Sequence, residues 1–523
     1  MLNELRVAST LLQDSIDRYA KACNSIKHSQ LGVSQVEGLA SFTLATELHQ
    51  LAAYEAKLRE SKAAIARYVN LCTSIVPANR LPSETLLRVF RLLVDMEHRK
   101  PFSSLQGIPK YPLILSHVCI AWRNIILRSP SLWSRIRISS DLRTDEFLKS
   151  YTDFHSGQTK EALLDILVSD SFDSRTRKAP SLSTFVVPFA GRIRSLELQL
   201  TIDEDPLVTT VGDLIAKSLE ASSNTLERFA LSAYPTDPEN LFIESSSRGS
   251  NNLITYLSHD QLEAILSRID DLWLRGLYFN WESKAYHGLT ALQLEHCYAA
   301  SISEPQLISI LASSPQLKWL DIGLDIIQTV ATPDLPSIYL PELELFVGSV
   351  LLLRLIRPGS NELTVSIIGN DGKPGMLYDA KVKDFFSCAN MVNFYSDGFL
   401  DHISGVNSLL SFAPRLRVLA VSHIELSGAS LDITTHNSLD TVYLLDGCTL
   451  EWPLLREMVT RWNIKRLVFW GKNYISRDEP KTIDSQKALE DELSDLPVKD
   501  IQLEFVPGNG PCPMDLFVGP SSK

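Results

Sequence analysis

The 523-residue sequence lacks the short motifs that bind nucleotides, activate nucleophiles or hold metals. It contains no G-x-x-x-x-G-K-[ST] loop, no G-x-G-x-x-G turn, no G-x-S-x-G elbow and no H-E-x-x-H pair. His287, His296 and Cys297 come nearest to a metal cluster, but neighbours on a strand point to opposite faces, so we expect Cys297 to be a small buried residue. We therefore expect no catalytic residues, no metal and no cofactor.

Basic residues and long apolar runs are also scarce. The 50 Lys and Arg are outnumbered by 62 Asp and Glu, and the net charge of −12 argues against nucleic acid and anionic membrane surfaces as partners. The longest uncharged apolar run, Leu345 to Leu353, is too short to span a bilayer. The start Met1-Leu2-Asn3-Glu4 does not predict a secretory signal. Seven scattered cysteines without a C-x-x-C pair predict reduced thiols, in the cytoplasm, the nucleus or both.

The first 75 residues contain almost no Pro or Gly and are predicted to be helical. A heptad seam repeats from Leu44 to Cys72, with Glu55 and Lys62 as polar interruptions. One interpretation is a helical hairpin that packs on the following segment. The other is a homodimeric coiled coil, whose stability the two charged seam positions would lower.

The segment from residue 81 to residue 136 carries the most specific pattern. Pro82 and Glu84 suit the first turn of a helix, where a missing N–H and a carboxylate are both tolerated. Two apolar faces follow at helical spacing, and Ser129-Pro130 ends the second one. Those faces consist of Leu86, Val89, Phe90 and Leu93, then Leu115, Val118, Cys119, Trp122 and Ile126. So small and so apolar a unit is expected to bury surface against a partner.

The order LPxE, then VCxxWR, then SPxLW resembles the F-box family, most closely the large fungal F-box sets. The alternative is an ordinary helical hairpin between two other domains. The resemblance covers about an eighth of the chain and departs from the family's pattern by a long insert, Asp95 to Pro112. It implies binding to a Skp-type adaptor and, through it, to a cullin. The residues expected at that contact or in its supporting core are Leu81, Pro82, Glu84, Leu86, Leu87, Phe90, Leu115, Val118, Cys119, Trp122, Leu132 and Trp133.

After Ile138 the spacing apolar-x-x-apolar-x-apolar recurs eleven times, with many starts about 23 to 34 residues apart. Helical faces lie between several of these strands, which argues for a parallel stack. The pattern predicts divergent leucine-rich repeats. The eleven segments begin at Leu163, Ile193, Leu226, Leu274, Leu289, Leu317, Leu340, Leu416, Leu439, Ile464 and Val498.

The expected fold class is therefore α plus α/β: N-terminal helices, a three-helix F-box, then an irregular leucine-rich-repeat-like solenoid. The expected domains are a helical segment at 1–75, the F-box at 76–140, the repeat domain at 141–505 and a C-terminal tail at 506–523.

In such a stack, the residue between the last two apolar anchors and the residue after them face the concave side of the sheet. This places four carboxylates, three aromatic side chains and two amides on a candidate surface for a basic protein segment, unless these residues only keep the sheet soluble. The candidates are Glu197, Tyr278, Asn280, Gln293, Glu295, Asp321, Glu344, Tyr443 and Trp470.

The resemblance implies a non-catalytic substrate receptor, which brings an unidentified protein substrate to a cullin–RING (SCF) ubiquitin ligase. The alternative is a repeat-domain scaffold that binds proteins without any ligase role.

Overall fold

The computed structural model describes most of the chain. The described residues are 2–28, 37–71, 77–98, 110–139, 144–170, 182–202, 208–235, 242–245, 253–295, 300–328, 336–368, 377, 379–400, 402–426, 436, 439–476, 480–493 and 501–508. Cys297, most of the insert after Asp95 and the tail beyond residue 508 lie outside them, so the predictions made for those residues stay predictions.

The chain divides into two compact units, Met1–Thr85 with Cys119–Ala121, and Leu86–Val118 with Trp122–Lys523. The first unit is helical, as its scarcity of Pro and Gly predicts. It contains α1 (Leu2–His28), α2 (Glu37–Leu71) and the 3-10 turn η1 (Pro77–Arg80). The Tyr19 hydroxyl on α1 donates to Glu47 Oε2 on α2 at 3.2 Å.

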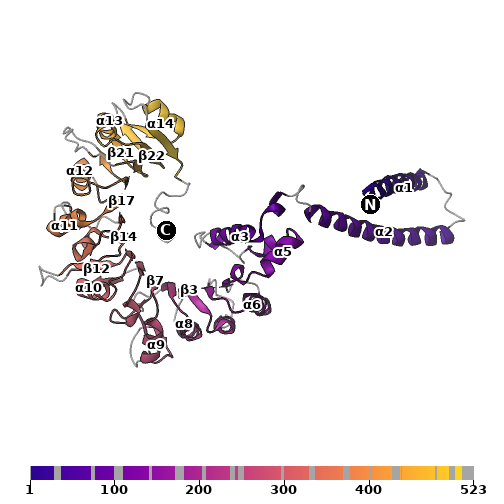
Figure 1. Ribbon diagram of the computed structural model, residues 1–523, viewed down its shortest axis with the longest axis horizontal. Helices are drawn as coiled ribbons and strands as arrows, with labels where there is room; N and C mark the ends of the chain where they lie inside the picture. Colours follow the sequence, from indigo (N-terminus) through magenta and orange to yellow (C-terminus); the bar gives the residue numbers. More distant parts are fainter. Residues whose placement is uncertain are drawn as a thin grey trace. The chain divides into compact units, whose positions relative to one another are not determined.

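The second unit is built on a sheet of fourteen strands that are all parallel and lie in sequence order (Figure 1). Alternation of helix and strand predicts such a sheet, and this part of the expected fold class is confirmed. The strands are β1 (Arg135–Ser139), β2 (Leu164–Asp170), β3 (Ile193–Ile202), β4 (Arg228–Pro235), β7 (Asp271–Arg275), β9 (Ala291–Glu295), β11 (Trp319–Ile322), β14 (Leu345–Gly348), β16 (Leu363–Ile367), β17 (Met391–Asp397), β18 (Val418–Ser422), β20 (Thr441–Leu444), β22 (Arg466–Trp470) and β25 (Gln502–Val506).

Helices connect these strands and lie along one side of the sheet (Figure 1). They are α6 (Asp145–Thr159), α7 (Ser183–Val186), α8 (Val208–Ser222), α9 (His259–Leu266), α10 (Glu304–Ser313), α11 (Ala380–Cys388), α12 (Ile403–Phe412), α13 (Trp452–Arg461) and α14 (Gln486–Leu493), with 3-10 turns η4 (Val187–Phe189), η5 (Lys284–Tyr286) and η6 (Val350–Leu355). The helical faces predicted between several strands are confirmed, for example by α9, α10 and α13, which bury Leu262, Leu307 and Leu454.

Short strands pair beside the large sheet. They are β5 (Phe242–Ser245), β6 (Leu253–Thr255) and β8 (Tyr278–Phe279); β10 (Ser301–Ser303) and β12 (Asp325–Ile327); β13 (Ile338–Leu340) and β15 (Ile356–Pro358); and β19 (Glu425–Leu426), β21 (Thr449–Glu451), β23 (Asn473–Ser476) and β24 (Pro480–Ile483).

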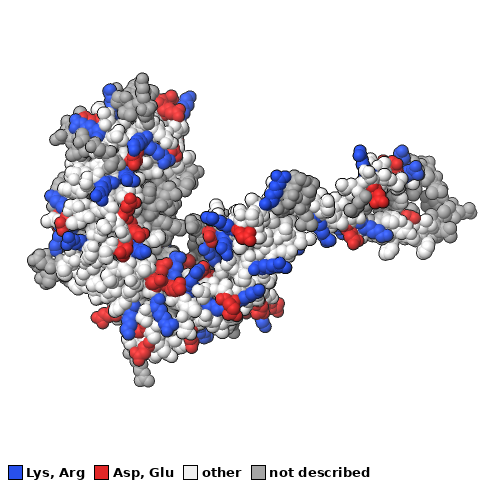
Figure 2. Space-filling model, viewed as in Figure 1, with Lys and Arg blue, Asp and Glu red and all other residues white. Residues whose placement is uncertain are grey.

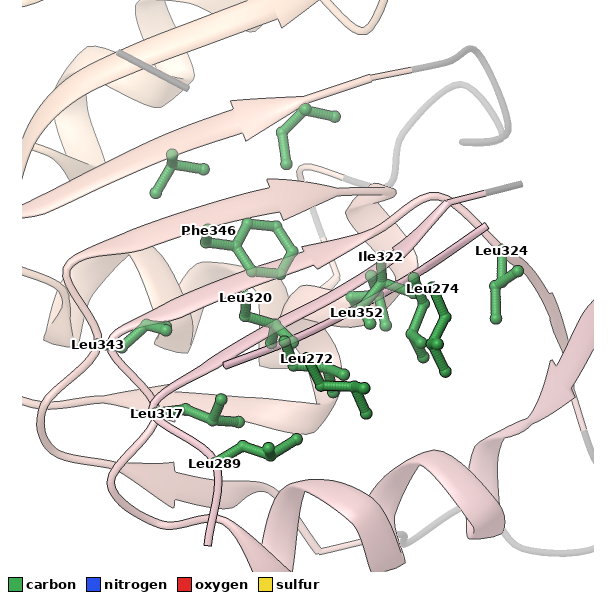
Figure 3. Packing of buried hydrophobic residues seen from close by; sticks show 14 of the residues in the cluster. Leu272, Leu274, Leu289, Leu317, Leu320, Ile322, Leu324, Leu343, Phe346 and Leu352 are labelled. Atoms are coloured by element: carbon green, nitrogen blue, oxygen red, sulfur yellow. The ribbon is translucent and has the colours of Figure 1, made fainter. Parts of the chain in front are cut away.

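The register of the large sheet sorts side chains into two faces. Leu272, Leu292 and Leu320 are aligned on consecutive strands, as are Leu274, Leu294 and Ile322 two residues later. Because side chains alternate along a strand, all six point to the side that the helices cover, and all are buried. Figure 3 shows members of these rows packed together in the core. We call the opposite side the open face; it carries the intervening positions, such as Ala291, Gln293 and Glu295.

Three of the eleven predicted registers are wrong. The anchors of β7 are Leu272 and Leu274, those of β14 are Phe346 and Gly348, and those of β25 are Leu503 and Phe505. The shift has a physical cause at β7, where Phe279 forms β8 of a separate sheet with β5 instead of continuing the large one.

The segment that resembles an F-box contains α3 (Ser83–His98), α4 (Leu113–Ser116), α5 (Ile120–Leu127) and the 3-10 turn η3 (Pro130–Leu132). The prediction of one helix from Leu115 to Ile126 is wrong, because the chain turns between α4 and α5. Arg123 Nε donates to the carbonyl of Ser116 at 2.9 Å across this break. β1 lies before the predicted boundary at residue 140, yet it is an edge strand of the large sheet.

Two polar side chains connect the turns near the end of the sheet. Asn473 is fully buried; its Nδ2 donates to the carbonyls of Leu444 and Trp470 at 3.2 and 3.1 Å, and its Oδ1 accepts from the Cys448 amide at 3.2 Å. The Cys448 thiol in turn donates to the carbonyl of Val421. Consecutive strands are therefore tied at their C-terminal ends as well as through the sheet.

Replacing Asn473 with Ala should lower the free energy of unfolding by about 2 to 3 kcal/mol, because three buried backbone groups lose their partner. Urea unfolding measures this change. The control is Asn361→Ala, whose amide makes a 3.4 Å bond to Glu342 near the surface and should cost less than about 1 kcal/mol. Equal losses in the two variants would contradict the role given to Asn473.

Candidate interaction surfaces

Helix α3 has one apolar face in a small core. Leu86, Phe90 and Val94 recur at i, i+4 and i+8 and are buried. Phe90 packs on Trp122 of α5 with ring centroids 4.8 Å apart. Burial of this face holds α3 against α5 and η3.

Trp133 connects this core to the sheet domain. Its Nε1 donates to the carbonyl of Ile126 at 3.0 Å, and its ring lies 5.2 Å from Phe154 of α6, edge to face. Arg135 of β1 forms a 2.9 Å ion pair with Asp95 of α3. These contacts join the small core of α3 and α5 to β1, the first strand of the large sheet.

A second apolar stripe of α3 is uncovered. Val89, Leu92 and Met96 lie at i, i+3 and i+7, on one face, and are 42%, 55% and 64% exposed. A helix that leaves three large apolar side chains this exposed on one face is typical of a protein-binding surface. We call these three residues the α3 stripe.

The predicted adaptor-contact residues fall into three groups. Leu86, Phe90, Leu115, Leu132 and Trp133 are buried; Leu87, Cys119 and Trp122 are partly buried; Leu81, Pro82, Glu84 and Val118 are exposed. The buried members can only support a contact, and the exposed members can make one. Leu92 and Met96 were missed by the sequence reasoning, although their i, i+4 spacing on the outer side of the helix was a signal for them.

The second surface is the middle of the open face, on β7, β9 and β11. Gln293 Nε2 donates to Glu295 Oε1 at 2.8 Å and to Asp321 Oδ2 at 3.0 Å. Arg275 of β7 forms a 3.4 Å ion pair with the other oxygen of Glu295. One amide therefore holds two carboxylates in place, and Arg275 pairs with one of them, Glu295.

Burial and like charge act together on these carboxylates. Burial, together with the negative charge of Glu295, raises the pKa of Asp321 to about 7. Burial also raises the pKa of Glu295, while Arg275 opposes that shift. Near neutral pH, Asp321 would gain from a cation placed beside it.

The open face becomes apolar towards its C-terminal end. Val347, Ala420, Tyr443, Leu445 and Val468 form a buried cluster there that is separate from the main core. Around it pack the partly buried Leu345, Tyr395, Val418, Trp470 and Val506. All of them come from β14 to β25 or from the residue that follows β20.

The predicted substrate-binding residues are only partly brought together. Glu197, Gln293, Glu295, Asp321, Tyr443 and Trp470 occupy positions on the open face.

Three positions were predicted wrongly. Tyr278 is fully buried, and its hydroxyl donates to the carbonyl of Glu295 at 2.6 Å. Asn280 follows β8 of the small sheet, and Glu344 precedes β14. The shifted registers put Trp273, Arg275, Leu345 and Val347 in their place.

Comparison with known proteins adds no relative. No protein-family model matches the chain, and no curated protein sequence matches it significantly.

The described residues also bear on two other features, membrane-spanning helices and metal sites. No helix among them is long and apolar enough to cross a membrane. Within the same residues, no three His, Cys, Asp or Glu side chains are grouped so that they could hold a metal ion. On the face shown in Figure 2, blue and red side chains are interspersed over the described surface.

Asp321→Asn should change how stability depends on pH. The folded-state pKa of about 7 lies above the ordinary value of 3.8, so the folded protein binds more protons than the unfolded chain between about pH 4 and pH 7. Its free energy of unfolding therefore falls as pH rises through that range. At about 1.4 kcal/mol per pKa unit, the variant should exceed the wild type by up to about 4 kcal/mol at pH 8 and match it near pH 4.

Urea unfolding at the two pH values measures the difference. Asp325→Asn, at an exposed carboxylate on β12, is the control and should change stability by less than about 0.5 kcal/mol at both. If the difference in free energy of unfolding between wild type and Asp321→Asn does not depend on pH, titration of Asp321 is not its cause.

Proposed function

We propose that the protein is an F-box substrate receptor that binds a Skp-type adaptor and presents a protein substrate to a cullin–RING (SCF) ubiquitin ligase. The observation that carries this proposal is the α3 stripe. It lies on the helix that follows Pro82 and has Glu84 in its first turn, in a segment whose order of motifs resembles the family.

In this proposal the α3 stripe makes the contact, and the core behind it holds the helix in place. Buried Leu86 and Phe90 fix the helix, so Leu92 and Met96 are presented without rearrangement of the backbone. Binding to a rigid, preformed apolar face costs less conformational entropy than binding to a flexible one. Leu81, Pro82 and Val118 are exposed further candidates for the contact.

In this proposal the sheet domain is a divergent leucine-rich-repeat-like solenoid, and its open face binds the substrate. The protein itself is not catalytic. Its contribution is proximity, because holding a substrate lysine near the charged ubiquitin carrier raises the effective concentration of the two groups. We place this activity in the cytoplasm, the nucleus or both.

The alternative is a scaffold that binds proteins through the same open face but has no ligase role. The two functions differ in one observable: a receptor co-purifies with both adaptor and cullin, whereas a scaffold brings down no cullin.

We also propose that α2 mediates a homodimer. Leu44, Leu48, Leu58 and Ile65 of the heptad seam are each at least 41% exposed. A 35-residue helix with its apolar seam in water gains stability by burying that seam against another helix. A second copy of the chain offers a matching seam.

The full chain co-expressed with a Skp-type adaptor should form a stable complex. Leu92→Asp together with Met96→Asp should weaken it at least about thirtyfold, equivalent to about 2 kcal/mol, because two apolar contacts are replaced by charges. Calorimetric titration measures the affinity. The control is Arg91→Asp, exposed on the same helix but turned about 100° away from Leu92, towards Ser131. A complex that tolerates the double variant would argue against the stripe as the contact.

Light scattering tests the homodimer on the full chain. The expected mass is twice the 58.5 kDa of one chain at micromolar concentration, reduced to one chain by Leu48→Glu with Leu58→Glu. Ala53→Glu is the control, since residue 53 lies on the side of the helix away from the seam. A wild-type chain that is monomeric at these concentrations would remove the dimer.

A further inference from the structure

A hollow of about 520 Å³ lies beside α9, apart from the open face and the α3 stripe. Its lining comes from α9, from β5 and β8 of the small sheet, and from the turn that leads into η5. Ligand pockets are commonly roughly 300 to 1,000 Å³ in volume. A ligand can reach this one, because six of its lining residues are exposed. They are His259, Asp260, Ala264, Asn280, Glu282 and Lys284.

The hollow forms where β8 ends before its neighbour. Phe279, the last residue of β8, pairs with Ile243, whereas β5 continues for two more residues. After Phe279 the chain turns at Asn280, whose Oδ1 accepts from the Glu282 amide at 3.0 Å. This turn carries the chain away from the end of β5 and places Asn280 and Glu282 at the rim of the hollow.

A buried carboxylate lines the hollow. Glu263 on α9 is 9% exposed; its Oε1 accepts from the Ser283 hydroxyl at 2.8 Å and its Oε2 from the Lys284 amide at 2.6 Å. Both donors are neutral, and no ion pair of Glu263 is found in the part of the chain that the structure describes. A buried charge without a counter-ion is unfavourable, so a cation in the hollow would be stabilised there.

The rim carries the same sign of charge. Asp260 and Glu282 are exposed, and neither forms an ion pair with another described residue. Glu244 is a further carboxylate of the lining, and Lys284 is the one lysine or arginine among the described lining residues. The balance of charge in the hollow therefore favours a cation.

The N-terminus of α9 does not reverse this preference. Ser258 Oγ accepts from the Gln261 amide at 3.3 Å, and Gln261 Oε1 accepts from the Ser258 amide at 3.1 Å. This capping box pairs amides of the first turn within the chain, and Asp260 adds a negative charge to the same turn. An anion would gain little from the helix end.

We propose that this hollow binds an arginine side chain of a partner protein segment, with the guanidinium facing Glu263, Asp260 and Glu282. The exposed Ala264 gives the apolar stem of the arginine a surface on which to lie. Arginine is favoured over lysine because its planar head is more weakly hydrated and donates to several carboxylate oxygens at once. The inference does not depend on the ligase function, since the hollow contains no residue of the α3 stripe or the open face.

Phage-displayed random peptides test this inference on the full chain, with selection on the wild type and counter-selection on Ala264→Trp. The exposed indole of that variant fills the hollow from its rim and leaves the core unchanged. Selected peptides should share an arginine. Replacing that arginine with citrulline, which keeps the length of the side chain and removes its charge, should weaken binding at least about tenfold in a calorimetric titration.

Further variants separate charge from volume. Asp260→Asn with Glu282→Gln, both at exposed positions, should reduce the preference for arginine over citrulline about fivefold. Asp325→Asn, at an exposed carboxylate outside the hollow, should leave that preference unchanged. Ala312→Trp adds the same indole at an exposed position of α10 and should leave peptide binding unchanged. Urea unfolding checks that Ala264→Trp is as stable as the wild type.

Three results would overturn the inference: no peptide that distinguishes the wild type from Ala264→Trp, selected peptides without arginine, or lysine in place of arginine without loss of affinity. Arg248 lies three residues after β5 in the sequence. Peptides that bind only after Arg248→Ala would assign the hollow to the chain's own arginine, and would overturn it too. A wild-type chain that selects arginine peptides but binds no Skp-type adaptor would count against the ligase function and leave this inference standing.

Discussion

The structure depends on the in-register parallel pairing of fourteen strands. Parallel neighbours place equivalent residues beside one another, so rows of leucine such as Leu272, Leu292 and Leu320 run across the sheet. Each row is buried by the helices on one side. Since a shift of one residue would move a whole row into water, the apolar pattern holds every strand to its register. The two faces of the sheet are therefore decided together.

The same alternation of side chains along each strand decides which residues lie on the open face. No helix-side core constrains the residues there, so they can be charged in the middle and aromatic towards the C-terminal end without loss of register. Some individual residues on this face make unfavourable contributions to stability. Asp321 is buried beside another carboxylate, and the Trp470 indole has no partner among the described residues. Such groups reduce stability, and they are understandable if a partner satisfies them.

The sequence predicted most of the sheet because leucine spacing reports burial directly. It failed where an apolar run belongs to another element. Leu277 and Phe279 are fully buried, as anchors should be, but Phe279 pairs in the small sheet and Tyr278 is buried with it. Periodicity alone cannot tell which sheet buries a residue. Likewise, no spacing rule identifies Asn473, whose role comes from the turns that its amide connects.

Helix α3 shows a second limit of prediction from the sequence. Its apolar residues cover more than half of its circumference, and the sequence cannot say which of them its own core takes. The structure assigns Leu86, Phe90 and Val94 to that core and leaves Val89, Leu92 and Met96 in water. Because a soluble helix gains nothing from exposed methionine and leucine, this surplus argues for a partner. The α3 stripe and the open face lie in separate elements, so a variant of one should leave binding at the other intact.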